Sequence, residues 1–140
     1  DSEEMAAALW ERAKPLLPAT YFAAGIRSAG EGGPESRPMR AVGMNARMRF
    51  CRYSRAGDRF EPHYDAAFVD TSRRPVRRSR WTFMMYLNDV AEEDGGSTDF
   101  LERGMGVSLP VQPEAGSVLC FDHDMFHRGA ELTRACDKYL

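Results

Sequence analysis

The chain has 140 residues, of which 43% are hydrophobic and 29% are charged, a size and composition typical of one globular domain. Its formal net charge of −2, from 19 basic and 21 acidic residues, argues against a general nucleic-acid binder. No apolar run approaches the ~20 residues that a membrane-spanning helix needs, no secretory signal is visible, and the three cysteines form no CxxC pair, so we expect an intracellular protein, cytoplasmic or nuclear, without membrane contact.

The first segment predicts an amphipathic helix from about Ser2 to Leu17. Ser2 is a suitable N-cap, acidic residues follow it where the helix dipole favours them, and apolar residues then repeat at helical spacing. The next stretch, Gly25 to Pro38, is rich in Gly, Ser, Pro and Glu and indicates a loop. We therefore assign residues 1–41 to an N-terminal helix and loop.

From residue 42 onward, short alternating or β-branched stretches are separated by turn signals such as Asp94-Gly95-Gly96. The expected strands are Arg47–Tyr53, Trp81–Leu87, Val107–Val111, Ser117–Phe121 and a last one near Lys138–Leu140. Several short strands with this punctuation are typical of sandwiches and barrels. We predict a mainly β core over residues 42–140, within a single domain that spans residues 1–140.

Two histidines and one aspartate form the candidate metal site. His63 and Asp65 are two positions apart, so on a strand their side chains point to the same face. An HxD pair alone is common by chance and is then a surface histidine beside an aspartate. His127 follows after a predicted strand, and two imidazoles with one carboxylate match the facial triad of non-haem iron(II) oxygenases.

Four segments in order resemble the prolyl 4-hydroxylase-like branch of the Fe(II)/2-oxoglutarate-dependent dioxygenases. They are Tyr53–Asp65, Tyr86–Asp89, Gly95–Phe100, and Pro113–Phe121 followed by His127-Arg128-Gly129. The resemblance implies a double-stranded β-helix (jelly-roll) core over residues 42–140. It also implies that His63, Asp65 and His127 bind iron and are the catalytic residues.

The resemblance further implies the reaction and its cofactors. Iron(II), 2-oxoglutarate as co-substrate, and O2 would hydroxylate a C–H bond of the substrate and give succinate and CO2. The substrate class is a protein or peptide, with a peptidyl proline as one example, or a small molecule. A nucleic-acid substrate is not expected, because the arginine-rich signature of nucleic-acid dealkylating oxygenases is missing.

The far carboxylate of 2-oxoglutarate needs a cation and a hydroxyl. By resemblance the cation is Lys138, which follows His127 by 11 positions, one more than the family pattern, and Arg134 is the alternative. Tyr53, Tyr86 and Thr98 are the candidate hydroxyls. Both tyrosines would otherwise be ordinary core residues whose hydroxyls are satisfied.

Three further features stay open at this point. His123 competes with His127 for the metal, although the position of Gly129 favours His127 by resemblance. Arg73 to Arg80 holds five arginines, which is either a solvated loop or a basic lid that selects an acidic or phosphate-bearing substrate. Arg49 is a candidate substrate-pocket residue.

The alternative to an oxygenase is a cupin-like jelly roll that binds metal without 2-oxoglutarate turnover.

Overall fold

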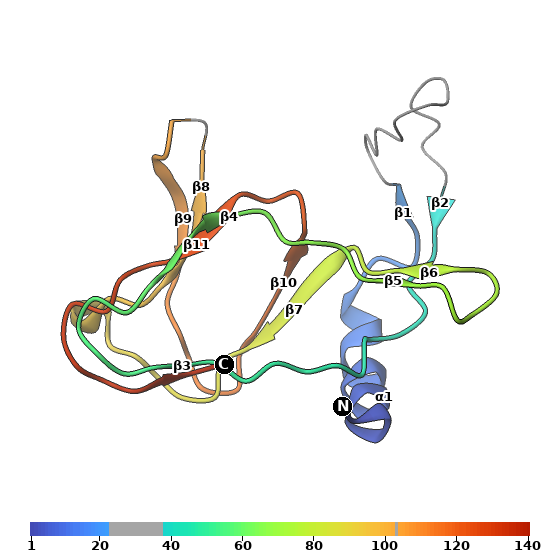
Figure 1. Cartoon of the computed structure of the whole chain (residues 1–140), viewed down its shortest axis with the longest axis horizontal. Coiled ribbons are helices and arrows are strands. Elements are labelled where there is room, and N and C mark those ends of the chain that lie inside the picture. The colour runs from blue at the N-terminus through green and yellow to red at the C-terminus, as the bar shows by residue number, and fades with distance from the viewer. Residues whose placement is uncertain (23–37, 103) are drawn as a thin grey trace. The chain divides into compact units, whose positions relative to one another are not determined.

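The computed structural model describes residues 1–22, 38–102 and 104–140. They are mainly β with one N-terminal α-helix, as predicted (Figure 1). The chain divides into two compact units, Asp1–Arg49 and Phe50–Leu140. The single catalytic domain over residues 1–140 stays a prediction. Within the described residues, no helix combines the length and apolar character that crossing a membrane requires.

The first unit begins with helix α1 (Glu3–Ala13), a 3-10 turn (Lys14–Leu16), and the short pair β1 (Tyr21–Phe22) and β2 (Pro38–Met39). The predicted N-cap is confirmed, because the Ser2 hydroxyl accepts a bond from the Met5 amide, 3.2 Å. The α-helix stops short of the predicted Leu17, since Pro15 cannot donate a backbone bond. The expected loop at 25–38 falls almost entirely outside the described residues.

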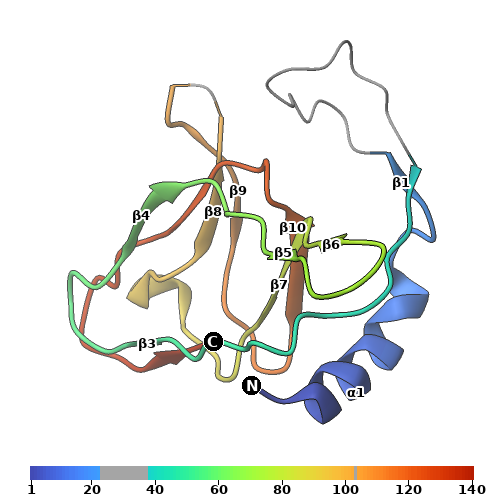
Figure 2. The same ribbon diagram turned by 45° about the vertical axis from the view of Figure 1, so that its right-hand side comes forward.

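The second unit contains only short antiparallel pairings among its described residues. Its strands are β3 (Arg52–Tyr53), β4 (Phe60–His63), β5 (Val69–Asp70), β6 (Arg77–Arg78), β7 (Trp81–Met85), β8 (Thr98–Leu101), β9 (Val107–Val111), β10 (Val118–Asp122), β11 (His127–Gly129) and β12 (Lys138–Tyr139), with a 3-10 turn at Glu92–Asp94. One sheet has the order β4-β11-β8-β9, and the other pairs are β7-β10, β3-β12 and β5-β6. The β7-β10 ladder lies opposite the four-stranded sheet in both views (Figures 1 and 2).

The strand predictions are partly wrong in extent. The expected strand Arg47–Tyr53 is reduced to β3, which pairs with β12, and backbone bonds between Cys51 and Leu140 continue this pairing by one residue. The expected Trp81–Leu87 ends at Met85, since the Leu87 amide bonds Tyr139 instead of β10. Val107–Val111 is confirmed, and the predicted Ser117–Phe121 starts and ends one residue later.

The core gathers on β8, whose four residues are all buried. Phe100 on this strand meets Phe121 of β10 edge to face, with ring centroids 5.1 Å apart. The predicted Gly95-Gly96 turn precedes β8, and Gly95 has φ 74°. A Cβ at Gly95 would lie 2.3 Å from the Glu131 carbonyl oxygen, so only glycine fits there. The core therefore fixes the position of β8, and β8 pairs with β11, which carries His127.

Candidate metal centre

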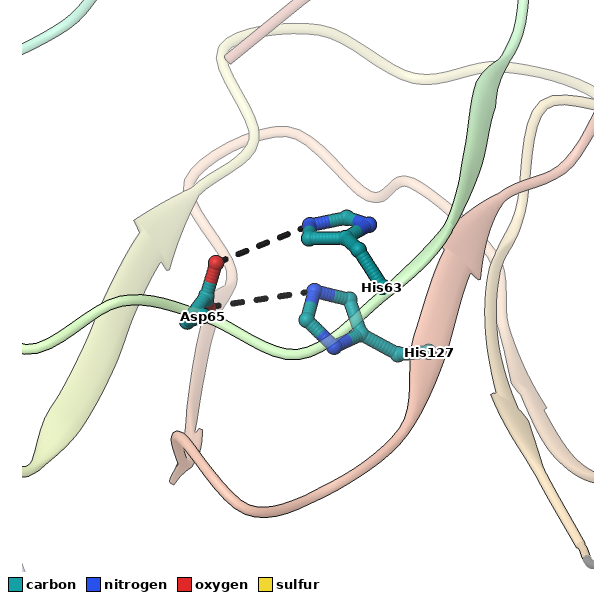
Figure 3. Close-up of side chains that lie close together, drawn as sticks. All are labelled: His63, Asp65 and His127. Carbon is teal, nitrogen blue, oxygen red and sulfur yellow. Dashed lines mark ion pairs between the residues drawn. The ribbon is translucent and has the colours of Figure 1, made fainter.

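Strand pairing brings the two predicted histidine ligands together. β4 and β11 are antiparallel neighbours in which His127 lies opposite His63, and their ring centroids are 4.3 Å apart. Asp65 follows β4 by two residues. Its carboxylate lies 3.6 Å from His63 Nε2 and 3.8 Å from His127 Nε2 (Figure 3). One ligand atom from each of the three residues lies within 4.8 Å of the others.

Backbone carbonyls fix the tautomer of both imidazoles. His63 Nδ1 donates to the Glu61 carbonyl oxygen, 2.7 Å, and His127 Nδ1 donates to that of Met125, 2.9 Å. A carbonyl oxygen can only accept, so the proton sits on Nδ1 in each ring. The Nε2 lone pairs are therefore free on the side of Asp65, which is the usual arrangement of metal-binding histidines.

Thr82 on β7 holds the carboxylate of the site. Its hydroxyl donates to Asp65 Oδ2, which fixes the orientation of the aspartate from the opposite ladder. Sequence reasoning missed this residue. The available signal was that Thr82 is the single polar side chain of the strand Trp81–Met85. A hydroxyl in an otherwise apolar strand needs a partner.

The triad is accessible from one side. The side chains of His63 and Asp65 are 24% and 26% exposed, while that of His127 is 7% exposed. The His127 ring packs edge-on against Phe121, with centroids 4.6 Å apart. Burial lowers the pKa of His127 more than the hydrogen bond to the Met125 carbonyl raises it, and the neighbouring His63 also lowers it. His127 is thus neutral near pH 7 and able to bind a metal.

The donor set fits a single divalent ion of the iron(II) type. Two imidazole nitrogens and one carboxylate oxygen are the ligands of the 2-His-1-carboxylate site, which leaves coordination positions open for other ligands. The exposed edge of His63 and Asp65 gives such ligands access. The three residues predicted from the sequence are the three that the structure brings together.

The family comparison agrees with this geometry. A family model described as the 2OG-Fe(II) oxygenase superfamily matches residues 48–140, which include all three ligands. The chain belongs to the 2OG-Fe(II) oxygenase superfamily. The comparisons with curated proteins and with solved structures give no match.

The oxygenase contains a second cluster, around Lys138. This residue is 3% exposed and lies opposite Tyr53 in the β3-β12 pair. Its Nζ donates to the Gly96 carbonyl oxygen, 2.7 Å, and lies 5.3 Å and 5.9 Å from the ring centroids of Tyr53 and Tyr86. The Tyr86 hydroxyl donates to Thr98 Oγ1, 2.7 Å. All four residues predicted for co-substrate binding lie together, while their role stays a prediction.

Electrostatics make Lys138 a candidate for binding an anion. Burial lowers the pKa of Lys138 to about 8, although Asp99 acts in the opposite direction. Among the residues that the structure describes, no carboxylate forms an ion pair with its amino group. A buried cation without a carboxylate partner, beside two tyrosine rings, fits the needs of a carboxylate ligand.

The other predicted residues of the oxygenase lie elsewhere or play different parts. Arg134 is 59% exposed, and its guanidinium pairs with Asp94. Arg49 is exposed and belongs to the first unit. His123 is buried and does not belong to the group of three ligands. Its Nδ1 has no hydrogen-bond partner in the described part of the chain.

Proposed function

We propose that this oxygenase is an iron(II)- and 2-oxoglutarate-dependent hydroxylase that converts a C–H bond of its substrate with O2. One observation carries the proposal: a three-residue metal site and a buried lysine without a carboxylate partner are linked by one strand, β8. Phe100 of β8 lies opposite His127, and Thr98, two residues before Phe100, lies beside Tyr86 of the Lys138 cluster. Two residues span about 7 Å on a strand, which suits a short dicarboxylate.

Each residue has a distinct part in this proposal. His63, Asp65 and His127 would hold the iron, which together with 2-oxoglutarate and O2 supplies the oxidising power for hydroxylation and gives succinate and CO2. Thr82 keeps the Asp65 carboxylate turned toward the two imidazoles. The two backbone-bonded Nδ1 protons keep both Nε2 atoms available as ligands.

Lys138 would bind the far carboxylate of 2-oxoglutarate, assisted by hydroxyl groups of Tyr86, Thr98 or Tyr53. Its low exposure matters for two reasons. A charged hydrogen bond is stronger where water is excluded, and a buried ammonium without a carboxylate partner gains from an anion that approaches. Arg134, with its exposed pairing to Asp94, offers neither condition.

We also propose that the β core is a jelly roll, as the family implies. The four-stranded order β4-β11-β8-β9 interleaves early and late strands of the chain. In addition, the Leu87 amide bonds the Tyr139 carbonyl, 3.0 Å, which connects the β7-β10 ladder to the β3-β12 pair. Two facing antiparallel layers with interleaved strands support this architecture.

The finer assignment is to the prolyl 4-hydroxylase-like branch, with a protein or peptide substrate such as a peptidyl proline. It is supported by the four ordered sequence segments between Tyr53 and Gly129 and by a lysine, not an arginine, at position 138. A small-molecule substrate is the other class compatible with the site.

Succinate formation tests the proposed function. We expect purified protein supplied with iron(II), 2-oxoglutarate, ascorbate and O2 to release succinate slowly even without its substrate, and the His63→Ala variant to release none. If the protein binds iron but neither releases succinate nor binds 2-oxoglutarate, it is the cupin-like binding module instead.

A further inference from the structure

The segment from residue 66 to residue 80, here called the arginine hairpin, begins and ends at the metal centre. The hairpin begins directly after Asp65 and ends directly before Trp81, which precedes Thr82. Because the Thr82 hydroxyl bonds the Asp65 carboxylate, both ends of the hairpin are held at the same ligand. The hairpin is therefore joined to the candidate iron site at both of its ends.

The base of the hairpin is well anchored. The Ser79 amide donates to the Phe68 carbonyl, and the Phe68 amide donates to the Ser79 hydroxyl, both at 2.8 Å. Arg80 pairs with Asp122 at 2.9 Å and with Asp124 at 2.6 Å, and its side chain is only 14% exposed. These contacts fix the base to the turn after β10.

The outer part of the hairpin carries positive charge that the protein does not neutralise. Arg73 pairs with Asp70, 3.1 Å, and Arg80 is paired at the base. The other three arginines, Arg74, Arg77 and Arg78, are exposed, and none forms an ion pair with a carboxylate among the described residues. This concentration stands out in a chain whose formal net charge is −2.

The arrangement of these charges indicates the kind of partner. Arg77 and Arg78 are neighbours on strand β6, so their side chains point to opposite faces, while Arg74 lies in the turn between β5 and β6. One small anion cannot contact all three guanidinium groups, whereas an extended chain with several acids can. Exposed Phe68 and Val76, 48% and 51% exposed, add apolar surface that suits a peptide.

We propose that the arginine hairpin docks an acidic segment of a protein substrate beside the metal centre. The substrate class follows from the charges and from the apolar side chains between them. This inference rests on the proposed function for its meaning, since docking serves to bring a substrate to the iron site. Nucleic acid is the competing polyanion, and the experiment separates the two.

Fluorescence anisotropy tests the docking with a labelled peptide rich in Glu with a few Leu residues, and with its Gln-for-Glu counterpart. We expect saturable binding of the acidic peptide, loss of binding for the Gln peptide, and weakening as salt is raised. The triple variant R74Q/R77Q/R78Q should bind the acidic peptide roughly tenfold more weakly.

The matched control removes three exposed arginines of the first unit, in the variant R12Q/R40Q/R47Q. It changes the net charge by the same amount, and it should bind the acidic peptide as the unsubstituted protein does. The thermal unfolding midpoint of both variants checks that they are folded. Equal losses in the two triple variants would overturn the proposal, because net charge alone would then explain binding.

Further outcomes distinguish a peptide partner from nucleic acid, and a failure of docking from a failure of the proposed function. If a single-stranded oligonucleotide of the same charge binds more tightly than the peptide and depends on the same arginines, the surface is a nucleic-acid site and the proposal fails. If the unsubstituted protein binds 2-oxoglutarate but no acidic peptide, docking alone is wrong. If it binds the peptide but not 2-oxoglutarate, the proposed function alone is wrong.

Discussion

The metal triad and the Lys138 cluster differ in exposure and in charge, and each combination suits a different ligand. The triad is a quarter exposed at His63 and Asp65, and it is held in place by hydrogen bonds that the two imidazoles donate to backbone carbonyls and that Thr82 donates to Asp65. The Lys138 cluster is positive and almost fully buried. A divalent cation thus finds an accessible, ordered site, whereas a carboxylate finds a charge whose burial is costly until it is paired.

The largest effect that this comparison predicts is in the triad itself. His63→Ala removes one of three ligands, so iron affinity should fall by more than about 100-fold, above the range that outer-shell changes give. Anaerobic iron titration against a competing chelator measures it. His123→Ala is the matched control, since His123 is outside the ligand group, and a similar loss in that variant would contradict the assignment of His127.

Lys138→Met should affect the second region and spare the first. We expect 2-oxoglutarate affinity to fall by about 2–3 kcal/mol, or roughly 30- to 150-fold, the range for a charged hydrogen-bonding partner, while iron affinity is kept. The free energy of unfolding of the variant should equal or exceed that of the unsubstituted protein, because a desolvated ammonium is replaced by an apolar group. Arg134→Met is the control, and the reverse result would move the carboxylate site to Arg134.

Thr82→Val should produce a smaller loss of iron affinity, about tenfold, which is typical for a residue that orients a ligand. The variant keeps the shape of the side chain and its strand, so the unfolding midpoint should change little. Unchanged iron affinity would mean that the Asp65 carboxylate is oriented without the β7 hydroxyl.

The sequence predicts the ligands of the triad but not the groups that orient them. His63, Asp65 and His127 could be identified because the HxD spacing keeps two possible ligands close together and the third histidine follows a predicted strand, although Asp65 lies beyond the end of β4 and not on a strand face. Thr82 could not, since its contact with Asp65 depends on how β7 packs across from β4. The Nδ1 partners of both histidines are backbone carbonyls, and because every residue has one, the sequence does not indicate which of them is used.

The fold shows the same limit. The expected strand Trp81–Leu87 ends at Met85, because the Leu87 amide bonds the Tyr139 carbonyl and not β10. Turn chemistry was more dependable, because the Gly95 conformation is required by the close Glu131 carbonyl. Local conformational constraints can be predicted from the sequence, whereas strand length depends on long-range pairing.

The smallest predicted effect is in pH dependence. The folded pKa of Lys138, about 8, is below its ordinary value, so the lysine loses its proton as pH rises through about 8. 2-Oxoglutarate needs the protonated form, and its affinity should be about fourfold weaker at about pH 8.5 than at pH 7. Lys138→Met should lack this dependence, and a flat profile in the unsubstituted protein would contradict Lys138 as the binding cation.

The lowered pKa of Lys138 also affects the free energy of unfolding of the protein without 2-oxoglutarate. A base whose folded pKa is lowered binds fewer protons in the folded than in the unfolded state, so the free energy of unfolding rises with pH between the two pKa values. This contribution should appear above about pH 8 and should be absent in Lys138→Met. Urea unfolding across this range measures it.

The most direct test of the central claim is an anaerobic titration of the iron(II)-loaded protein with 2-oxoglutarate, followed by visible absorption. We expect a saturable charge-transfer band that is lost in His63→Ala and shifted to higher 2-oxoglutarate concentration in Lys138→Met. Iron binding to a folded protein with no band at any 2-oxoglutarate concentration would contradict it.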